Sequence, residues 1–154
     1  MAQIKRVRGK RGTKRWFQWW MVPVIMSTAL WFLFQFVLLI GYVPTESMEP
    51  VLKKGSYLVA TRIYTSLESG DVIVFRRDGG LLVKRIAAVG GDKVDLGRLS
   101  YASDWAIPKR DEEVFVVPEG CFFVLGDNTE KSLDSRYWEE MFVKESDVVA
   151  KMWE

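Results

Sequence analysis

The sequence contains no histidine and only one cysteine, Cys121. The absence of histidine excludes Ser-His-Asp and Cys-His nucleophilic sites. A single cysteine can form neither an intrachain disulfide nor a CxxC redox motif, and zinc sites built on histidine or cysteine clusters are excluded as well. If the protein is a hydrolase, its catalytic base must therefore be a lysine or a carboxylate.

Charged residues are absent from the 25 residues between Trp16 and Ile40. As a helix rising about 1.5 Å per residue, this segment would be about 38 Å long, enough to cross a hydrocarbon core of about 30 Å. A core helix of this length would normally show a polar stripe. A cleavable signal peptide would have a shorter apolar stretch and then a small-x-small cleavage site, which residues 41–44 do not provide. We therefore expect an uncleaved transmembrane helix over residues 16–40.

The charges differ on the two sides of this expected helix. Residues 1–15 carry seven basic groups and no acid, whereas the rest of the chain has 15 basic and 20 acidic residues, a net charge of −5 within an overall +2. Basic flanks of membrane helices stay in the cytoplasm. The pattern predicts a single-pass protein of the cell membrane, with a cytoplasmic tail (1–15) and an extracytoplasmic domain (41–154). Nucleic-acid binding is not indicated, because the remaining domain is acidic.

Residues 41–154 are expected to form one mainly β domain. Glycine, proline and aspartate recur at short intervals as turn signals, and few stretches keep a helical period for three turns. Between the turns, β-branched and aromatic runs predict strands at 57–63, 72–75, 81–89, 114–117, 121–125 and 148–153. The segment 97–113 has no such run and is expected to be an irregular excursion from the sheet.

The first segment with candidate chemistry is Pro44–Pro50, in which Ser47 lies between two prolines soon after the apolar run. Because prolines restrict the backbone, the serine is expected in a short extended or turned segment. It lies at most about 25 Å from Ile40, so a site there would act at the membrane surface. Taken alone, the segment reads more simply as a juxtamembrane linker.

The second segment is the predicted strand 81–89. Strand alternation places Leu82, Lys84 and Ile86 on one face and Arg85 on the other. Burial between apolar neighbours disfavours an ammonium group and lowers its pKa, and a neutral lysine can accept a proton from a serine hydroxyl, which an arginine cannot. Taken alone, a lysine between apolar residues more commonly lies at a sheet edge, where its aliphatic stem covers apolar surface and its ammonium group reaches the solvent.

The third segment, Gly126–Trp138, is dense in polar groups and follows an apolar predicted strand. It resembles a calcium loop only in part, because the central glycine and terminal glutamate of an EF-hand are missing. A long solvated hairpin loop is the plain alternative. The functional interpretation is a polar shell in which Ser132 orients a lysine and Asp134 pairs with Arg136.

Together, in this order, the motifs resemble type I signal peptidases, the membrane-bound Ser/Lys proteases that remove signal peptides from exported preproteins. The resemblance covers the anchor and almost all of the domain. It rests on four boxes: Ser47-Met48-x-Pro50, Gly70-Asp71-Val72-Ile73-Val74, Lys84-Arg85-Ile86 followed by Gly91-Asp92, and Gly126-Asp127-Asn128 with Ser132, Asp134, Ser135 and Arg136. It implies a mostly antiparallel β fold with an exposed apolar surface near the bilayer.

The resemblance also implies the roles of the site residues. Ser47 would be the nucleophile and Lys84 the general base, and Ser132 would orient the lysine. Bracing of the site would fall to Asp127, Asp134 and Arg136. The Ser47 N–H and the hydroxyl of Thr45, which stands at a family serine position, would donate to the oxyanion. Glu46 stands where a glycine is common and Thr129 where an arginine is common, which leaves the local backbone, the charge and one bracing ion pair open.

The implied substrates are preproteins with small residues at the −1 and −3 positions, held in shallow apolar pockets. The residues expected to line these pockets are Val43, Pro44, Met48, Leu52, Leu82 and Val83. No metal or organic cofactor is expected, and the expected partners are signal peptides and the lipid bilayer, with the secretion translocon as a further candidate.

Three alternatives remain at this point. The self-cleaving repressors of the DNA-damage response share the Ser/Lys chemistry, but they have no membrane span. A specialised maturation peptidase serving pili or conjugation would use the same chemistry as a signal peptidase. A non-catalytic membrane-tethered binding module would be expected to have lost the serine or the lysine, and both are present here.

Overall fold

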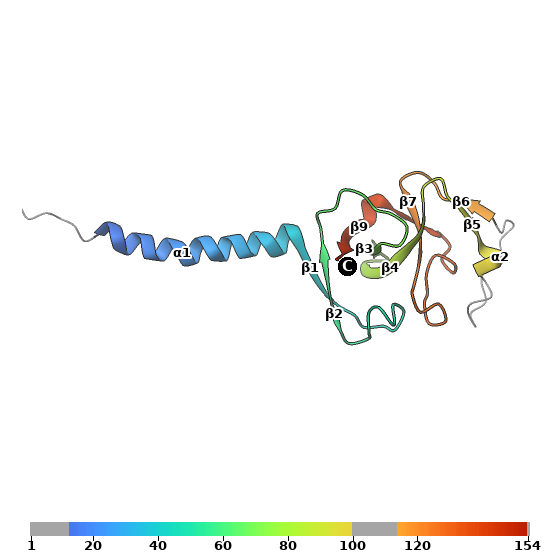
Figure 1. Ribbon diagram of the computed structural model, residues 1–154, viewed down its shortest axis with the longest axis horizontal. Helices are drawn as coiled ribbons and strands as arrows, with labels where there is room; N and C mark the ends of the chain where they lie inside the picture. Colours follow the sequence, from blue (N-terminus) through green and yellow to red (C-terminus); the bar gives the residue numbers. More distant parts are fainter. Residues whose placement is uncertain (1–12, 100–113, 154) are drawn as a thin grey trace, which may run out of the picture. The chain divides into compact units, whose positions relative to one another are not determined.

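The computed structural model describes residues 13–99 and 114–153 and divides into two units, Met1–Gln35 and Phe36–Glu154 (Figure 1). Most of the expected basic tail, residues 1–12, lies outside the described residues. The first unit contains α1 (Thr13–Phe32), which continues as the π-helical turn η1 (Leu33–Val37). The stretch Trp19–Val37 is long and apolar enough to cross a membrane, with a mean hydropathy of 1.7.

The expectation of a helix through Ile40 is wrong at its C-terminal end. Residues Leu38–Tyr42 form strand β1, which pairs antiparallel with β2 (Tyr57–Thr61). Leu39 is buried and Ile40 is exposed, so this stretch alternates between two faces as a strand does. An unbroken apolar run conceals the change, because apolar helices and apolar strands have similar compositions.

The second unit is built on a seven-stranded sheet in which every neighbouring pair is antiparallel, in the order β1-β2-β9-β3-β4-β7-β8. The prediction of a mainly antiparallel β fold with one N-terminal apolar helix is confirmed. The remaining strands of the sheet are β3 (Val72–Arg77), β4 (Gly80–Val89), β7 (Cys121–Leu125), β8 (Phe142–Lys144) and β9 (Val148–Met152).

A smaller, two-stranded sheet pairs β5 (Lys93–Asp95) with β6 (Val114–Val116), and a short helix, α2 (Leu96–Leu99), follows β5. A 3₁₀ turn, η3 (Glu145–Asp147), leads into β9. All six predicted strands overlap observed ones, whereas β1, β5 and β8 were not predicted. The segment 97–113, expected to be irregular, begins inside α2, and its residues 100–113 lie outside the described part.

The β3–β4 hairpin sets the position of the candidate base. Asp78 and Gly79 have φ values of +49° and +77°, as the two central residues of a type I′ turn require. This turn pairs Arg77 with Gly80, and the register then places Lys84 opposite Ile73. Lys84 therefore lies on the sheet face of Ile73 and Ile86, which is covered by an apolar cluster, and its side chain is buried there.

Among the described residues, the two halves of strand β4 pair on different edges, and the two pairings overlap only at Arg85. Its N-terminal half pairs with β3, whereas pairing with β7 begins at Arg85. Packed side chains cover the sheet in three apolar clusters, one of which joins β1, β2, β3 and β9 to Met48 and Leu52. The segment that carries Ser47 is therefore anchored in the core, beside the partly unpaired stretch of β4.

Candidate active site

Ser47 lies in a turn between β1 and β2 and is only 9% exposed. Backbone hydrogen bonds from Glu49 N–H to the Glu46 carbonyl (3.1 Å) and from Leu52 N–H to the Met48 carbonyl (2.8 Å) form this turn. The side chain of Met48 is buried in the core and anchors the segment. The expected turned conformation of the segment is observed. The hydroxyls of Thr45 and Ser47 lie 3.3 Å apart, within hydrogen-bonding distance.

Lys84 is 3% exposed, as strand alternation predicts, and its Nζ donates a hydrogen bond of 2.9 Å to Ser132 Oγ. Burial is the largest influence and lowers the pKa of Lys84 to about 8. Nearby charges have smaller and opposing effects, because Asp134 and Asp127 raise this pKa and Arg136 lowers it. The site thus holds a lysine that loses its proton much more readily than an exposed lysine.

Ser132 belongs to the long connection between β7 and β8, which is fastened to β7 by buried polar contacts. Ser135 exchanges two hydrogen bonds with the backbone of Val124, at 3.0 Å and 3.2 Å. The fully buried Asp134 accepts hydrogen bonds from Arg136 at 2.8 Å and 2.9 Å, as an ion pair with two contacts. It also accepts one from Gly126 N–H at 3.0 Å. The expected pairing of Asp134 with Arg136 is thus present in the geometry.

Asp127 contacts the strand that carries Lys84. Its two carboxylate oxygens accept hydrogen bonds of 2.7 Å and 2.8 Å from the guanidinium of Arg85, the neighbour of Lys84 on β4. Such two-point pairs fix the orientation of both groups as well as their distance. Thr129, at the position where the bracing ion pair was left open, contacts Arg136 through its backbone, because Arg136 donates a hydrogen bond to the Thr129 carbonyl at 3.0 Å.

Ser47 and Lys84 line one cavity of about 520 Å³. Their side chains are not hydrogen-bonded to each other in the described structure, and catalytic hydrogen bonds often form only when substrate binds. Five of the six residues expected to contact substrate line this cavity, namely Val43, Pro44, Met48, Leu82 and Val83. Leu52 does not, because the turn that follows Met48 directs it into the core cluster.

Sequence reasoning missed half of the cavity lining: Tyr42, Arg77, Asp78, Gly80, Leu81, Lys131, Leu133 and Trp138. One wall is a stack in which the Arg77 guanidinium lies 4.0 Å from the ring centre of Trp138. These two residues are far apart in sequence, and no spacing rule connects them. Within the described residues, no group of three or more cysteine or acidic side chains is placed to hold a metal ion.

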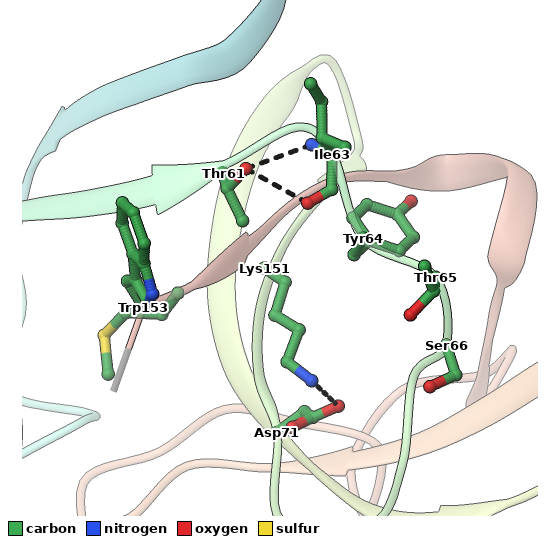
Figure 2. Close-up of a pocket in the computed structure, with 9 residues that line it drawn as sticks. Thr61, Ile63, Tyr64, Thr65, Ser66, Asp71, Lys151 and Trp153 are labelled. Atoms are coloured by element: carbon green, nitrogen blue, oxygen red, sulfur yellow. Dashed lines mark hydrogen bonds and ion pairs between the residues drawn. The ribbon is translucent and has the colours of Figure 1, made fainter.

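A second hollow of about 400 Å³ shares no lining residue with this cavity. Figure 2 shows Lys151 extending to Asp71, with Tyr64, Thr65 and Ser66 on one side and Trp153 on the other. The Lys151–Asp71 ion pair, at 2.7 Å, ties β9 to the start of β3. No candidate catalytic residue lines this hollow, so it is separate from the candidate active site.

The chain matches the model of a known protein family. The model of the family described as "Signal peptidase, peptidase S26" matches residues 13–100 and 97–153, nearly the whole chain. The chain belongs to this family. The match spans both the apolar helix and the β domain, so the two units are parts of one family architecture.

Individual relatives agree with the family. A probable thylakoidal processing peptidase 2 of Arabidopsis thaliana is 32% identical over 66% of this chain and 34% of its own length. A probable signal peptidase I-2 of Synechocystis is 31% identical over 63% of this chain and 54% of its own length. This chain thus spans about a third and about half of those two relatives. Signal peptidase I of Bacillus caldolyticus is 29% identical over 99% of this chain and 92% of its own length.

Gly126 has a steric role that sequence reasoning did not assign. A Cβ at this position would overlap Ser132 Oγ and would lie 2.5 Å from both Ser132 Cβ and the Ser47 carbonyl oxygen. The backbone of Gly126 therefore separates the serine that contacts Lys84 from the segment of the candidate nucleophile. Only a residue without a side chain fits between them.

Gly126→Ala should accordingly disturb the site more than the fold. We expect an overpacking cost of about 1–3 kcal/mol in the free energy of unfolding, together with a longer distance between Ser132 Oγ and Lys84 Nζ. Chemical denaturation in detergent and a crystal structure of the variant would measure these two effects. As a control, Gly55→Ala changes a glycine with open space around it, although its φ of +86° makes some strain inevitable. An unchanged site geometry in Gly126→Ala would refute the steric argument.

Proposed function

We propose that the chain is a membrane-anchored serine endopeptidase that removes N-terminal signal peptides from exported preproteins by means of a Ser47–Lys84 dyad. The observation that carries the proposal is the buried Lys84, whose pKa is lowered to about 8 and which lines the same cavity as Ser47. Membership of the peptidase S26 family and the names of the relatives support the activity. These names favour a signal peptidase over a pilus or conjugation peptidase or a non-catalytic module.

In the proposed acylation step, neutral Lys84 takes the hydroxyl proton of Ser47 as Ser47 Oγ attacks the scissile carbonyl carbon. Collapse of the tetrahedral intermediate breaks the C–N bond, and the Lys84 ammonium gives its proton to the leaving amine. Ser132 holds Lys84 Nζ in place through the 2.9 Å hydrogen bond. The mature protein leaves with a free amino terminus, and the signal peptide remains as an ester on Ser47.

In the proposed deacylation step, a water gives a proton to the same lysine and attacks the ester carbonyl, and the proton then returns to Ser47 Oγ. The negative oxygen in both steps would be bound by the Ser47 N–H and the Thr45 hydroxyl. The Thr45 hydroxyl lies 3.3 Å from Ser47 Oγ, close to where that oxygen would form. Neither step requires a metal or an organic cofactor.

The cavity is suited to an extended peptide with small side chains. Its lining is apolar beside Ser47, where Val43, Pro44 and Val83 lie, and small substrate residues would fit there. The half of β4 before Arg85 pairs only with β3 among the described strands. An extended substrate could add to this edge by backbone hydrogen bonds, the usual mode of strand addition.

The proposed location follows from the apolar helix and the charges. The stretch Trp19–Val37 would anchor the chain in the bilayer, with the basic tail in the cytoplasm and the β domain on the outer side. Signal peptides emerge at the membrane surface, so the bilayer and the secretion translocon are the proposed partners. A determination of which precursors accumulate when the protein is depleted would separate this role from pilus or conjugation processing.

A pH–rate profile tests the proposed base directly. Because Lys84 must be neutral to act, kcat/KM for a preprotein should rise with pH and level off above an apparent pKa of about 8. Cleavage would be measured in detergent between pH 6 and about 10.5, an upper limit near the pKa of an ordinary lysine. A rise that continues to the pKa of an exposed lysine, with no ionisation nearer neutrality, would contradict a buried base.

A further inference from the structure

An ion pair joins the residues that precede the two serines of the proposed site. Glu46 precedes Ser47 and Lys131 precedes Ser132, and Lys131 Nζ donates a hydrogen bond of 2.6 Å to Glu46 Oε2. The two side chains come from separate segments, the turn between β1 and β2 and the connection between β7 and β8. The pair thus bridges the segment of the nucleophile and the segment that holds the base.

A second polar contact between these segments is the backbone hydrogen bond from Asn128 N–H to the Ser47 carbonyl, at 3.1 Å. On the second segment, Lys131 N–H bonds the Asn128 carbonyl at 3.1 Å, which places Lys131 in the same turn as this contact. Since Ser47 Oγ and Lys84 Nζ are not hydrogen-bonded to each other in the described structure, their separation depends on how the two segments are held.

We infer that the Glu46–Lys131 ion pair is a positioning clasp that holds Ser47 within reach of Lys84. The inference rests on the proposed Ser/Lys peptidase activity. Lys131 also lines the cavity of Ser47 and Lys84, so the clasp lies at the rim of the site and not at a remote surface. A misplacement of about 1 Å can lower the rate of a catalysed step by about 100-fold.

Because the Glu46–Lys131 pair is exposed, an effect of its loss on catalysis can be distinguished from an effect on the stability of the fold. The side chains of Lys131 and Glu46 are 61% and 33% exposed, and exposed ion pairs contribute little to folding. Loss of the clasp should therefore leave the melting temperature nearly unchanged while it lowers kcat. A residue that served only the stability of the fold would not produce this combination.

Lys54 provides a matched control. Its Nζ lies 3.4 Å from Glu46 Oε1, so Glu46 contacts two lysines. Lys54 follows Glu46 on the same segment, however, and its removal leaves the bridge to the other segment intact. Lys54→Gln therefore takes away a comparable charge contact without opening the clasp.

The experiment measures kcat and KM for a preprotein with the full-length chain in detergent, together with thermal unfolding. Glu46→Gln and Lys131→Gln should each lower kcat by about tenfold and change KM by less than about twofold, as expected for loss of positioning. The double variant should be no worse than either single variant, because both remove the same interaction. Lys54→Gln should keep kcat within about twofold of the unchanged chain.

Other results would overturn the clasp. Unchanged kcat in both single variants, or additive losses in the double variant, would show that the pair does not act as a unit. A rise in KM confined to Lys131→Gln would make Lys131 a substrate contact instead. If the unchanged chain cuts no preprotein, the proposed function fails and the clasp fails with it. If the unchanged chain and Glu46→Gln cut a preprotein equally well, the result contradicts the clasp alone.

Discussion

Lys84→Met, Lys84→Arg and Ser47→Ala should each lower kcat/KM for preprotein cleavage by about 10⁴-fold or more, as removal of a catalytic nucleophile or base does elsewhere. Methionine has nearly the length of lysine but cannot accept a proton. Arginine keeps the positive charge, but its guanidinium does not lose a proton at accessible pH. Both substitutions at Lys84 therefore remove the base, and Ser47→Ala removes the attacking oxygen. The measurement is single-turnover cleavage of a purified preprotein in detergent.

The fold should survive the two mildest of these changes. Lys84→Met replaces a buried ammonium by an apolar group of similar shape, and Ser47→Ala removes one oxygen, so the circular dichroism and melting temperature should be preserved. Ser47→Ala/Lys84→Met should be no less active than either single variant, because the two groups act as one unit. Lys93→Met, at an exposed position on β5, is the matched lysine control. Normal cleavage by Ser47→Ala or Lys84→Arg would refute the dyad.

The burial of Lys84 could be predicted because it depends on local geometry. Alternation along one strand determines which residues share a face, and the Asp78-Gly79 turn fixes the register with β3. The order of the polar residues in the 126–138 segment could likewise be assigned through the resemblance to a family. That Ser132 contacts Lys84 and Asp134 contacts Arg136 is now seen in the structure, while their catalytic roles stay predictions.

The errors arose where tertiary contacts decide the outcome. The apolar run continues past Val37, but β2 offers a pairing edge, so Leu38–Tyr42 form a strand and not the end of a helix. Leu52 is apolar and close to Ser47 in sequence, yet the turn places it in the core. The contact of Glu46 with Lys131 spans 85 positions and has no periodic signal that a sequence could reveal.

Arg136→Met is expected to have the largest effect on stability, because it leaves a buried carboxylate without its cation. Asp134 and Arg136 are 0% and 1% exposed, and breaking such a pair on one side typically costs about 3–5 kcal/mol. The hydrogen bonds that remain to Asp134, from Gly126 N–H and from the backbone N–H of residue 136, do not neutralise the charge. Chemical denaturation followed by tryptophan fluorescence in detergent would measure the loss.

Two controls separate burial from charge. Lys151→Met breaks the Lys151–Asp71 pair in the hollow of Figure 2, whose side chains are 30% and 17% exposed, so its cost should be at most about 1 kcal/mol. Arg136→Lys keeps a cation but loses the two-point contact, and it should remain folded enough to assay if Arg136→Met does not. Equal losses of stability in Lys151→Met and Arg136→Met would contradict the dominant role of burial.

The same substitution should also change the catalytic profile in a definite direction. Arg136 lowers the pKa of Lys84 and Asp134 raises it, so removal of the guanidinium leaves the carboxylate unopposed and the lysine more basic. The rise of kcat/KM with pH should then move to higher pH in Arg136→Met, and activity at neutral pH should fall by more than activity at high pH. Asp134→Asn/Arg136→Met removes both charges and should return the profile towards that of the unchanged chain. Only the electrostatic explanation predicts that loss of a second buried group restores the pH dependence. If the double variant kept the displaced pH profile, the displacement would therefore reflect distortion of the β7–β8 connection and not a change in charge.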